Sequence, residues 1–198
     1  TKTIFVRPGD LIRIKSEEPD ETGNITIERA IVRSNNPFFI RLANEEQLQD
    51  EMAALYMKTG FFLKGAGGYY YEGDLTNTAQ QNKWMQFWRE TEFRSRLSYN
   101  KDNIRATRGR GISGMAWGQG ELIASPAALA RMASAIANHG LLVPNRYVLR
   151  ISDSLLPVKQ AIAAAKNPQY AELMIKYMKA QSAPKIGRLG IAVAGKTG

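Results

Sequence analysis

The sequence predicts an α+β domain with strands near both ends of the chain and helices in the middle. Three observations support this fold class. Residues 1–15 alternate apolar and polar side chains, with Ile4 and Val6 on one face. The middle holds several segments with apolar side chains at helical spacing, and residues 189–195 have the pattern of a strand. With 198 residues, 44% of them hydrophobic, the chain is long enough for an ordinary globular core.

The first third of the chain is expected to contain a short β unit followed by two helices. Pro8-Gly9-Asp10 is a turn signal, and residues 16–24 are polar enough for a loop. A helix is predicted over 26–33, with Thr26 at its N-cap. It should stop at Ser34-Asn35-Asn36-Pro37, because the residue before a proline disfavours helical backbone, and Pro37 can open a second helix.

The next segments alternate between expected helices and expected loops. Residues 45–58 predict a helix ended by Thr59-Gly60, and residues 81–96 predict another. Residues 64–74 and 98–120 are rich in glycine and are expected to be loops. The apolar stripe of the first of these helices consists of Leu48, Met52, Leu55 and Tyr56.

Two helices with clear start signals follow. Residues 125–138 begin with Ser125 and Pro126, which suit an N-cap and a first helical position, and His139-Gly140 closes the helix. A later helix starts in the same way at Asn167 and Pro168. The side chains expected to be buried are Leu129, Met132, Ala133 and Ile136 in the first, and Tyr170, Leu173, Met174, Tyr177 and Met178 in the second.

Composition excludes several classes of site. The absence of cysteine rules out a disulfide scaffold, a Cys-ligated zinc site and a cysteine nucleophile. A single histidine, His139, argues against a His-dependent triad or a multi-His metal site, so neither a metal nor a cofactor is expected. The net charge of +9 permits a polyanionic partner without requiring one. No apolar run approaches the roughly 20 residues of a membrane helix.

The tripeptide Lys-Thr-Gly occurs twice, in two different contexts. Lys58-Thr59-Gly60 lies at the end of a predicted helix, where lysine complements the helix dipole and glycine ends the turn. Lys196-Thr197-Gly198 follows the predicted strand 189–195, one face of which carries only small side chains. A site for an extended, carboxylate-ended peptide needs such a strand, a positive charge and a hydroxyl donor. The second copy therefore favours a functional interpretation over a structural one.

Two weaker patterns also occur twice each. Ser34-Asn35-Asn36 lies on a turn between two predicted helices, whereas Ser98-Tyr99-Asn100 lies in a basic loop and is expected at the surface. Ser-x-x-Lys occurs at Ser98–Lys101 and at Ser182–Lys185. That pair needs a helical turn, so the loop at the first site and Pro184 at the second make both poor candidates for a nucleophile.

These pieces together resemble the transpeptidase domain of penicillin-binding proteins, whose signature is Ser-x-x-Lys, Ser-x-Asn and Lys-Thr-Gly in that order. Ser34-Asn35-Asn36 and Lys196-Thr197-Gly198 follow that order. Residues 117–121, 125–130 and 136–140 resemble the family's "GQG…TP-x-x-LA…IANGG" stretch, in the form typical of the monofunctional class B enzymes. The resemblance covers nearly the whole chain, least well a basic, aromatic insertion over 62–112.

The resemblance implies both a fold and a reaction. The fold is an antiparallel sheet flanked by helices, beside a mostly helical lobe. The reaction is D,D-transpeptidation: an activated serine attacks the D-Ala-D-Ala carbonyl of a stem peptide, D-Ala leaves, and an amine of another strand accepts the acyl group. Ser34 would act in proton transfer, and Lys196 would hold positive potential beside it. Asn36 would bind the peptide amide, Thr197 the terminal carboxylate, and Gly198 would lie beneath the substrate.

The chain departs from the family pattern at the nucleophile. Residues 1–33 contain no Ser-x-x-Lys, so residues 1–198 are interpreted as a partial domain that is inactive alone. The implied partners are peptidoglycan stem peptides, β-lactam antibiotics and other cell-wall synthesis proteins, with no nucleic acid. The implied location is periplasmic or otherwise extracytoplasmic, with a membrane anchor outside this chain.

Three other functions remain open. A β-lactamase or β-lactam sensor would share the fold, and a non-catalytic relative would only dock partners. A nucleic-acid-binding module is the alternative of a different class, because residues 84–110 combine an excess of lysine and arginine with aromatic side chains.

Overall fold

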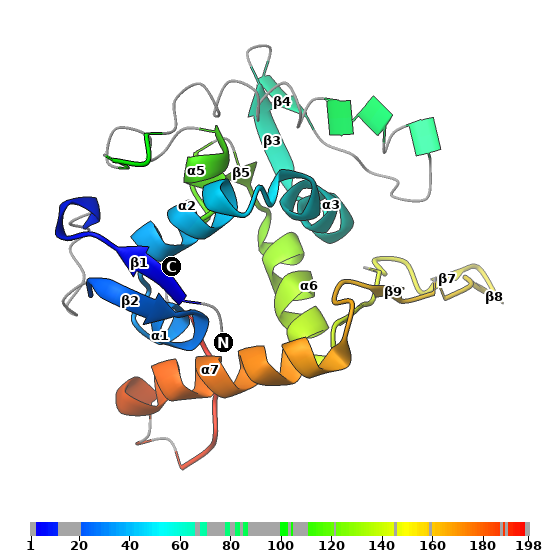
Figure 1. Cartoon of the computed structure of the whole chain (residues 1–198). Helices are drawn as coiled ribbons and strands as arrows, with labels where there is room; N and C mark the ends of the chain where they lie inside the picture. Colours follow the sequence, from blue (N-terminus) through cyan, green and yellow to red (C-terminus); the bar gives the residue numbers. More distant parts are fainter. Residues whose placement is uncertain are drawn as a thin grey trace.

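The computed structural model of the chain describes residues 3–11, 21–65, 68–70, 78–79, 82–83, 85–86, 100–102, 104, 111–120, 122–144, 146–158, 160–186, 188 and 190–196. Its elements are helices and several small sheets, which confirms the predicted α+β class (Figure 1). Every strand pair in these ranges is antiparallel.

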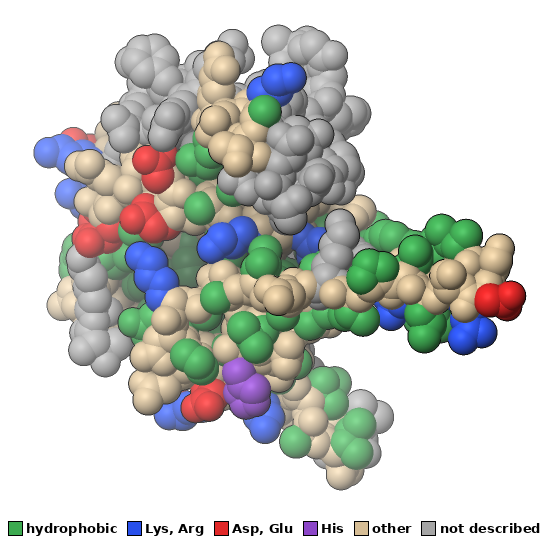
Figure 2. All heavy atoms as spheres, turned by 90° about the vertical axis from the view of Figure 1, so that its right-hand side faces the viewer, with side chains coloured by type: hydrophobic (Ala, Val, Ile, Leu, Met, Phe, Trp, Pro, Cys, Tyr) green, Lys and Arg blue, Asp and Glu red, His purple; other side chains and the backbone are tan. Residues whose placement is uncertain are grey.

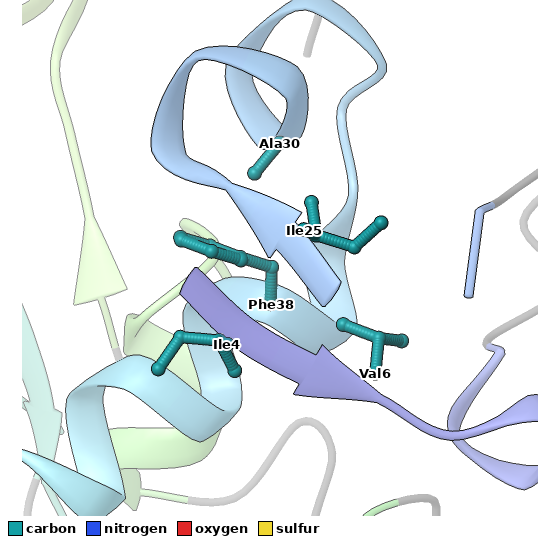
Figure 3. Packing of buried hydrophobic residues seen from close by; sticks show 5 residues of the cluster. All are labelled: Ile4, Val6, Ile25, Ala30 and Phe38. Atoms are coloured by element: carbon teal, nitrogen blue, oxygen red, sulfur yellow. The ribbon is translucent and has the colours of Figure 1, made fainter. Parts of the chain in front are cut away.

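The first sheet is a strand pair with one buried face. Strand β1 (Thr3–Val6) pairs with β2 (Gly23–Thr26), and Ile4 lies opposite Ile25. Phe5 is 57% exposed, so the predicted alternation along β1 holds. The expected loop over 16–24 is wrong at its end, where the chain enters β2. Figure 3 shows the core that this sheet forms with the two helices that follow: Ile4, Val6, Ile25, Ala30 and Phe38.

Helices α1 (Ile27–Val32) and α2 (Asn36–Glu45) follow β2 directly. The Thr26 hydroxyl accepts a hydrogen bond from the Arg29 N–H at 3.2 Å, which confirms the predicted N-cap. The helix pair also confirms the predicted break at Ser34–Pro37, because α1 ends before Ser34 and α2 begins within the break.

A buried ion pair ties three segments together. A 3-10 turn, η1 (Pro8–Asp10), brings the Asp10 carboxylate to the Arg41 guanidinium of α2, with Nε to Oδ2 at 2.6 Å. Both side chains are at least 96% buried. Arg41 also donates to the Lys101 carbonyl at 3.0 Å and pairs with Glu45 at 3.1 Å. Its charge is therefore well compensated.

A three-stranded sheet lies beside α3 (Gln49–Thr59) and α5 (Gly111–Met115), in the order β4 (Gly68–Tyr70), β3 (Phe62–Gly65), β5 (Leu122–Ile123). The loops expected over 64–74 and 98–120 are therefore wrong where the sheet and α5 form. Ala53 and Met115 are fully buried here. The Tyr56 hydroxyl donates to the Met115 carbonyl at 2.7 Å, and burial raises the pKa of Tyr56 to about 12.

Helices α6 (Pro126–Ala137) and α7 (Pro168–Ile186) confirm the predicted starts. The Ser125 hydroxyl accepts from the Ala128 N–H at 3.1 Å, and the Asn167 side chain accepts from the Gln169 N–H at 2.9 Å. None of the described helices is long and apolar enough to cross a membrane.

The predicted buried faces of α6 and α7 are wrong in part. Leu129 and Tyr170 are 48% and 61% exposed, whereas the buried side chains are Ala128 and Ala135 on α6 and Ala171, Gln181 and Ser182 on α7. Helix α6 contacts α3 and α7. Small side chains let such helices approach closely, and this turns their large neighbours outward.

Between α6 and α7 the chain forms a projecting arm (Figure 1). Strands β6 (Leu141–Leu142) and β9 (Ile162–Ala163) pair at its base, and β7 (Arg150–Ile151) and β8 (Ser154–Leu155) form its outer hairpin. Figure 2 shows hydrophobic side chains along the surface of this arm. The most exposed of them are Tyr147, Leu149, Ile151, Leu155 and Val158.

The strand predicted over 189–195 is wrong. The described residues 190–196 form no strand and instead follow α7, where the Gly195 N–H donates to the Met178 carbonyl at 3.4 Å. A strand is stabilised by its ladder partner, and no described strand pairs with this segment. Pro184 lies inside α7, so the expectation that it prevents a helix there is also wrong.

Candidate active site

The turn between α1 and α2 holds Ser34, which is half-buried, in an uncommon backbone conformation. Its φ is +51°, in the left-handed region. The Ser34 N–H donates to the Ile31 carbonyl and the Asn35 N–H to the Ala30 carbonyl, at 3.3 and 2.9 Å. This is the Schellman pattern of a helix end, whose left-handed position usually holds glycine. A serine there points to a use for its side chain.

Asn35 fixes the turn from the other side. Its fully buried side chain accepts from the Phe38 N–H at 3.0 Å, which caps α2, and donates to the Glu21 carbonyl at 2.9 Å. Ser34 thus lies between two helices whose ends are both bonded. Asn36, the residue predicted to bind the substrate amide, is the first residue of α2 and is half-buried.

Lys196 reaches this turn from the opposite end of the chain. Its Nζ donates to the Ser34 Oγ at 2.6 Å, across 162 residues of sequence. The structure thus brings together the two residues that were predicted to be catalytic. A lysine amine in hydrogen-bond contact with a serine hydroxyl can pass a proton to it and stabilises negative charge nearby. The chemical roles of the two residues stay predictions.

Glu21 supplies the negative charge beside this turn. Arg29 Nε donates to its Oε2 at 2.6 Å, and Arg33 Nε lies 3.3 Å from its Oε1. The hydrogen bond from Arg29 holds the pKa of Glu21 below its ordinary value. Glu21 therefore makes two kinds of contact at the turn: its carboxylate pairs with Arg29 and Arg33, and its main-chain carbonyl accepts a hydrogen bond from Asn35.

The other predicted residues either lie outside the described parts of the chain or are buried. Thr197 and Gly198 lie outside the described residues, as does Ser98 and most of the segment 84–110 that raised the question of nucleic-acid binding. Ser182, the other Ser-x-x-Lys serine, is 6% exposed, and main-chain carbonyls of Met178, Lys179 and Val193 surround its hydroxyl. A serine so enclosed is a poor nucleophile.

The first Lys-Thr-Gly ends a helix, as predicted. Gly60 has a φ of +76°, the Thr59 hydroxyl donates back to α3, and Lys58 Nζ donates to the Ala163 carbonyl at 3.2 Å. The lone histidine, His139, lies exposed after α6 with its Nδ1 3.8 Å from Glu172 Oε1. Among the described residues, no group of three or more acidic or histidine side chains could hold a metal ion.

Two residues near the site were missed by sequence reasoning. Glu21 lies in the segment expected to be a polar loop, and Ser182 was weighed only as a nucleophile. Glu21 belongs to no motif, and the Ser-x-x-Lys match of Ser182 indicates a different role, so only their hydrogen bonds in the structure reveal them.

A comparison with protein families identifies one match. The family model described as penicillin binding protein transpeptidase domain matches residues 2–198. No curated protein and no solved structure matches the chain significantly.

Proposed function

Because the chain belongs to the penicillin-binding protein transpeptidase domain family, we propose that it forms part of a serine-type D,D-transpeptidase that cross-links peptidoglycan stem peptides. The observation that carries this proposal is the 2.6 Å hydrogen bond from Lys196 Nζ to Ser34 Oγ. It links one residue of the Ser-x-Asn motif to the lysine of the Lys-Thr-Gly motif, which supports a single site for the two motifs.

The proposed reaction has two acyl-transfer steps. A serine Oγ bonds to the carbonyl carbon of the penultimate D-Ala, the C–N bond to the terminal D-Ala breaks, and the leaving amine takes a proton. An amine of a second stem peptide then bonds to the same carbon, and the ester C–O bond breaks with return of the proton to the serine. No cofactor or metal takes part.

Ser34 and Lys196 would handle the proton in both steps. The Ser34 hydroxyl can relay a proton to the leaving amine, because Lys196 Nζ replaces it from within hydrogen-bond distance. The ammonium charge would also favour the carboxylate of the donor peptide or of a β-lactam. Asn36 would bind the peptide amide, Thr197 would bind the carboxylate through its hydroxyl, and Gly198 would leave room for the substrate backbone.

The nucleophilic serine of this proposal is not one of the serines in this chain. The two Ser-x-x-Lys matches lie after Ser34 in sequence, whereas the family order places that motif before Ser-x-Asn. We therefore place the nucleophile on a segment preceding residue 1. The whole protein would work outside the cytoplasm on peptidoglycan, with β-lactams as inhibitors, with an anchor and cell-wall synthesis partners beyond this chain, and without nucleic acid.

Labelling with a fluorescent penicillin tests this proposal. The 198-residue chain alone should give no covalent band at 22.0 kDa, because it lacks the attacking serine. The protein extended to include the preceding Ser-x-x-Lys should give a band that unlabelled penicillin abolishes. A stable band from the short chain would contradict the placement of the nucleophile, and no band from the extended protein would contradict the function.

A further inference from the structure

Helix α7 holds the segment that carries Lys196. The main chain at Val193 and Gly195 lies against α7, where the Gly195 N–H donates to the Met178 carbonyl at 3.4 Å. One turn further along the helix, the Ser182 hydroxyl donates to the Val193 carbonyl. These two bonds flank Ala194 and lie just before the lysine.

The Ser182 hydroxyl has one proton and three carbonyl oxygens within reach. Two belong to its own helix, Met178 at 2.9 Å and Lys179 at 3.3 Å, and the third and nearest is Val193. A helical serine commonly bonds back to its own helix. Here the shortest contact leaves the helix for the segment that carries Lys196.

Ser182 is buried next to Gly195, with room for a methyl group between them. Ser182 is 6% exposed, and a Cβ built on Gly195 would lie 3.5 Å from the Ser182 Cβ, at ordinary contact distance. Helix α7 also packs against α1, whose end carries Ser34. The same helix therefore contacts the helix that precedes Ser34 and the segment that precedes Lys196.

We propose that Ser182 is a positioning residue for Lys196: its hydroxyl anchors the main chain at Val193 and so sets Lys196 Nζ on the Ser34 hydroxyl. This inference rests on the proposed transpeptidase function for its catalytic meaning. Without the Ser182 hydroxyl, the segment loses its bond at Val193. Of the described main-chain bonds to α7, the 3.4 Å bond of Gly195 then remains, and Lys196 is positioned less firmly.

Two substitutions separate this role from a structural one. Ser182→Ala removes the hydroxyl and keeps the Cβ beside Gly195, whereas Ser182→Thr keeps the hydroxyl. Ser134→Ala, at an exposed serine on α6, is the matched control. Hydrogen exchange of the 198-residue chain, measured by mass spectrometry, reports on residues 190–196. Penicillin acylation of the extended protein reports on the site.

The expected result is local. In Ser182→Ala, amide exchange in 190–196 should rise about three- to tenfold, the range for loss of one hydrogen bond, with exchange in α6 unchanged. The acylation rate should fall by a similar factor at saturating penicillin. Ser182→Thr and Ser134→Ala should match the wild type in both measurements.

Two results would overturn the proposal. Unchanged exchange in 190–196 of Ser182→Ala would mean that the hydroxyl bonds only within α7, and a uniform rise over the whole chain would mean that it merely stabilises the fold. If the extended wild-type protein forms no acyl-enzyme, the proposed function fails, but the exchange measurement still decides whether Ser182 anchors the segment.

Discussion

Ser34 occupies a backbone position that suits glycine better than serine. Left-handed backbone raises the free energy of a residue with a Cβ by about 1–2 kcal/mol, and the Schellman hydrogen bonds at the end of α1 hold Ser34 there. The conformation aims the hydroxyl at Lys196. The left-handed backbone therefore lowers the stability of the turn but places the Ser34 Oγ within hydrogen-bond distance of Lys196.

We predict that Ser34→Gly stabilises the fold while it removes the site. Glycine relieves the left-handed strain, so the free energy of unfolding should rise by about 0.5–1 kcal/mol. Ser34→Ala keeps the strain and loses the same hydroxyl, so it is the matched control and should not gain stability. Urea denaturation of both variants measures the difference. A Ser34→Gly protein no more stable than Ser34→Ala would contradict the account of this turn.

Glu21 gives the same turn a dependence on pH. Its folded-state pKa is lowered, first by the hydrogen bond from Arg29 and also by the charges of Arg29 and Arg33. A carboxyl with a lowered folded pKa stabilises the protein at pH values above its unfolded pKa, about 4.3, and that contribution disappears as the pH falls through the folded pKa.

The prediction for Glu21→Gln follows from the lowered pKa of Glu21 in the folded state. At pH 7 the variant should be less stable than the wild type, and the difference should shrink steadily as the solution is acidified below about pH 4. Urea denaturation at a series of pH values measures it. A difference that persists unchanged at low pH would show that the charge of Glu21 does not support the turn.

At the scale of elements, the sequence predicts strand β1 and the helix starts with a side-chain cap well, but it begins α3 four residues early and misses strands β3 and β4. Thr26, Ser125 and Asn167 were found because an N-cap depends on a side chain and the backbone two or three residues further on. Strand β4 and the end of β3 fall in the expected loop 64–74, because the glycines and tyrosines there show no alternation and form a sheet only by pairing between strands.

The same contrast, between features set by neighbouring residues and features set by distant segments, applies to the candidate site. The turn at Ser34 and the motif at Lys196 were predictable from local residue types and from their order. The conformation of 190–196 was not, because the apolar alternation of Ile191 and Val193 indicates a strand whereas the main chain bonds to α7. Contacts between distant segments decided the outcome there.

Gly140 offers a test of how the projecting arm joins α6. Its φ is +85°, and an added Cβ would lie 2.7 Å from the Ala165 Cβ, beyond β9. Gly140→Ala should therefore lower the free energy of unfolding by about 2–4 kcal/mol, from backbone strain plus a clash.

Gly118 is the matched control for this substitution. Its φ is +79°, but no described atom lies within 4 Å of the added Cβ. Gly118→Ala should show the strain alone, about 1 kcal/mol. Equal losses in the two variants, measured by urea denaturation, would mean that the close approach of Ala165 does not matter.

At the scale of the molecule, a buried charge pair joins the first turn of the chain to its centre. Asp10 and Arg41 connect η1 to α2, and Arg41 extends the link to Lys101. Removal of one member of a buried pair leaves the other charge incompletely compensated, which typically destabilises a protein by about 3–5 kcal/mol.

Asp10→Asn should therefore lower the free energy of unfolding by about 3 kcal/mol. Glu45→Gln is the matched control, because Glu45 contacts the same guanidinium but its side chain is 42% exposed. The free energy of unfolding of Glu45→Gln should fall by less than about 1 kcal/mol. Similar losses in the two variants would show that burial does not strengthen the Asp10 contact.

The candidate site is itself a property of the whole molecule. Ser34 comes from the turn after α1 and Lys196 from the segment after α7, and the packing of α1 against α7 accompanies their contact. If these two residues act together in acylation, a substitution that removes the contact between them should lower the acylation rate.

The acylation rate of the extended protein with penicillin tests the central claim most directly, in Lys196→Gln compared with Lys58→Gln. The two lysines belong to identical tripeptides, but only Lys196 contacts Ser34, whereas Lys58 bonds to the Ala163 carbonyl at a helix end. We predict a loss of about a hundredfold or more for Lys196→Gln and a wild-type rate for Lys58→Gln. Equal rates in the two variants would contradict the assignment of the active site to Ser34 and Lys196.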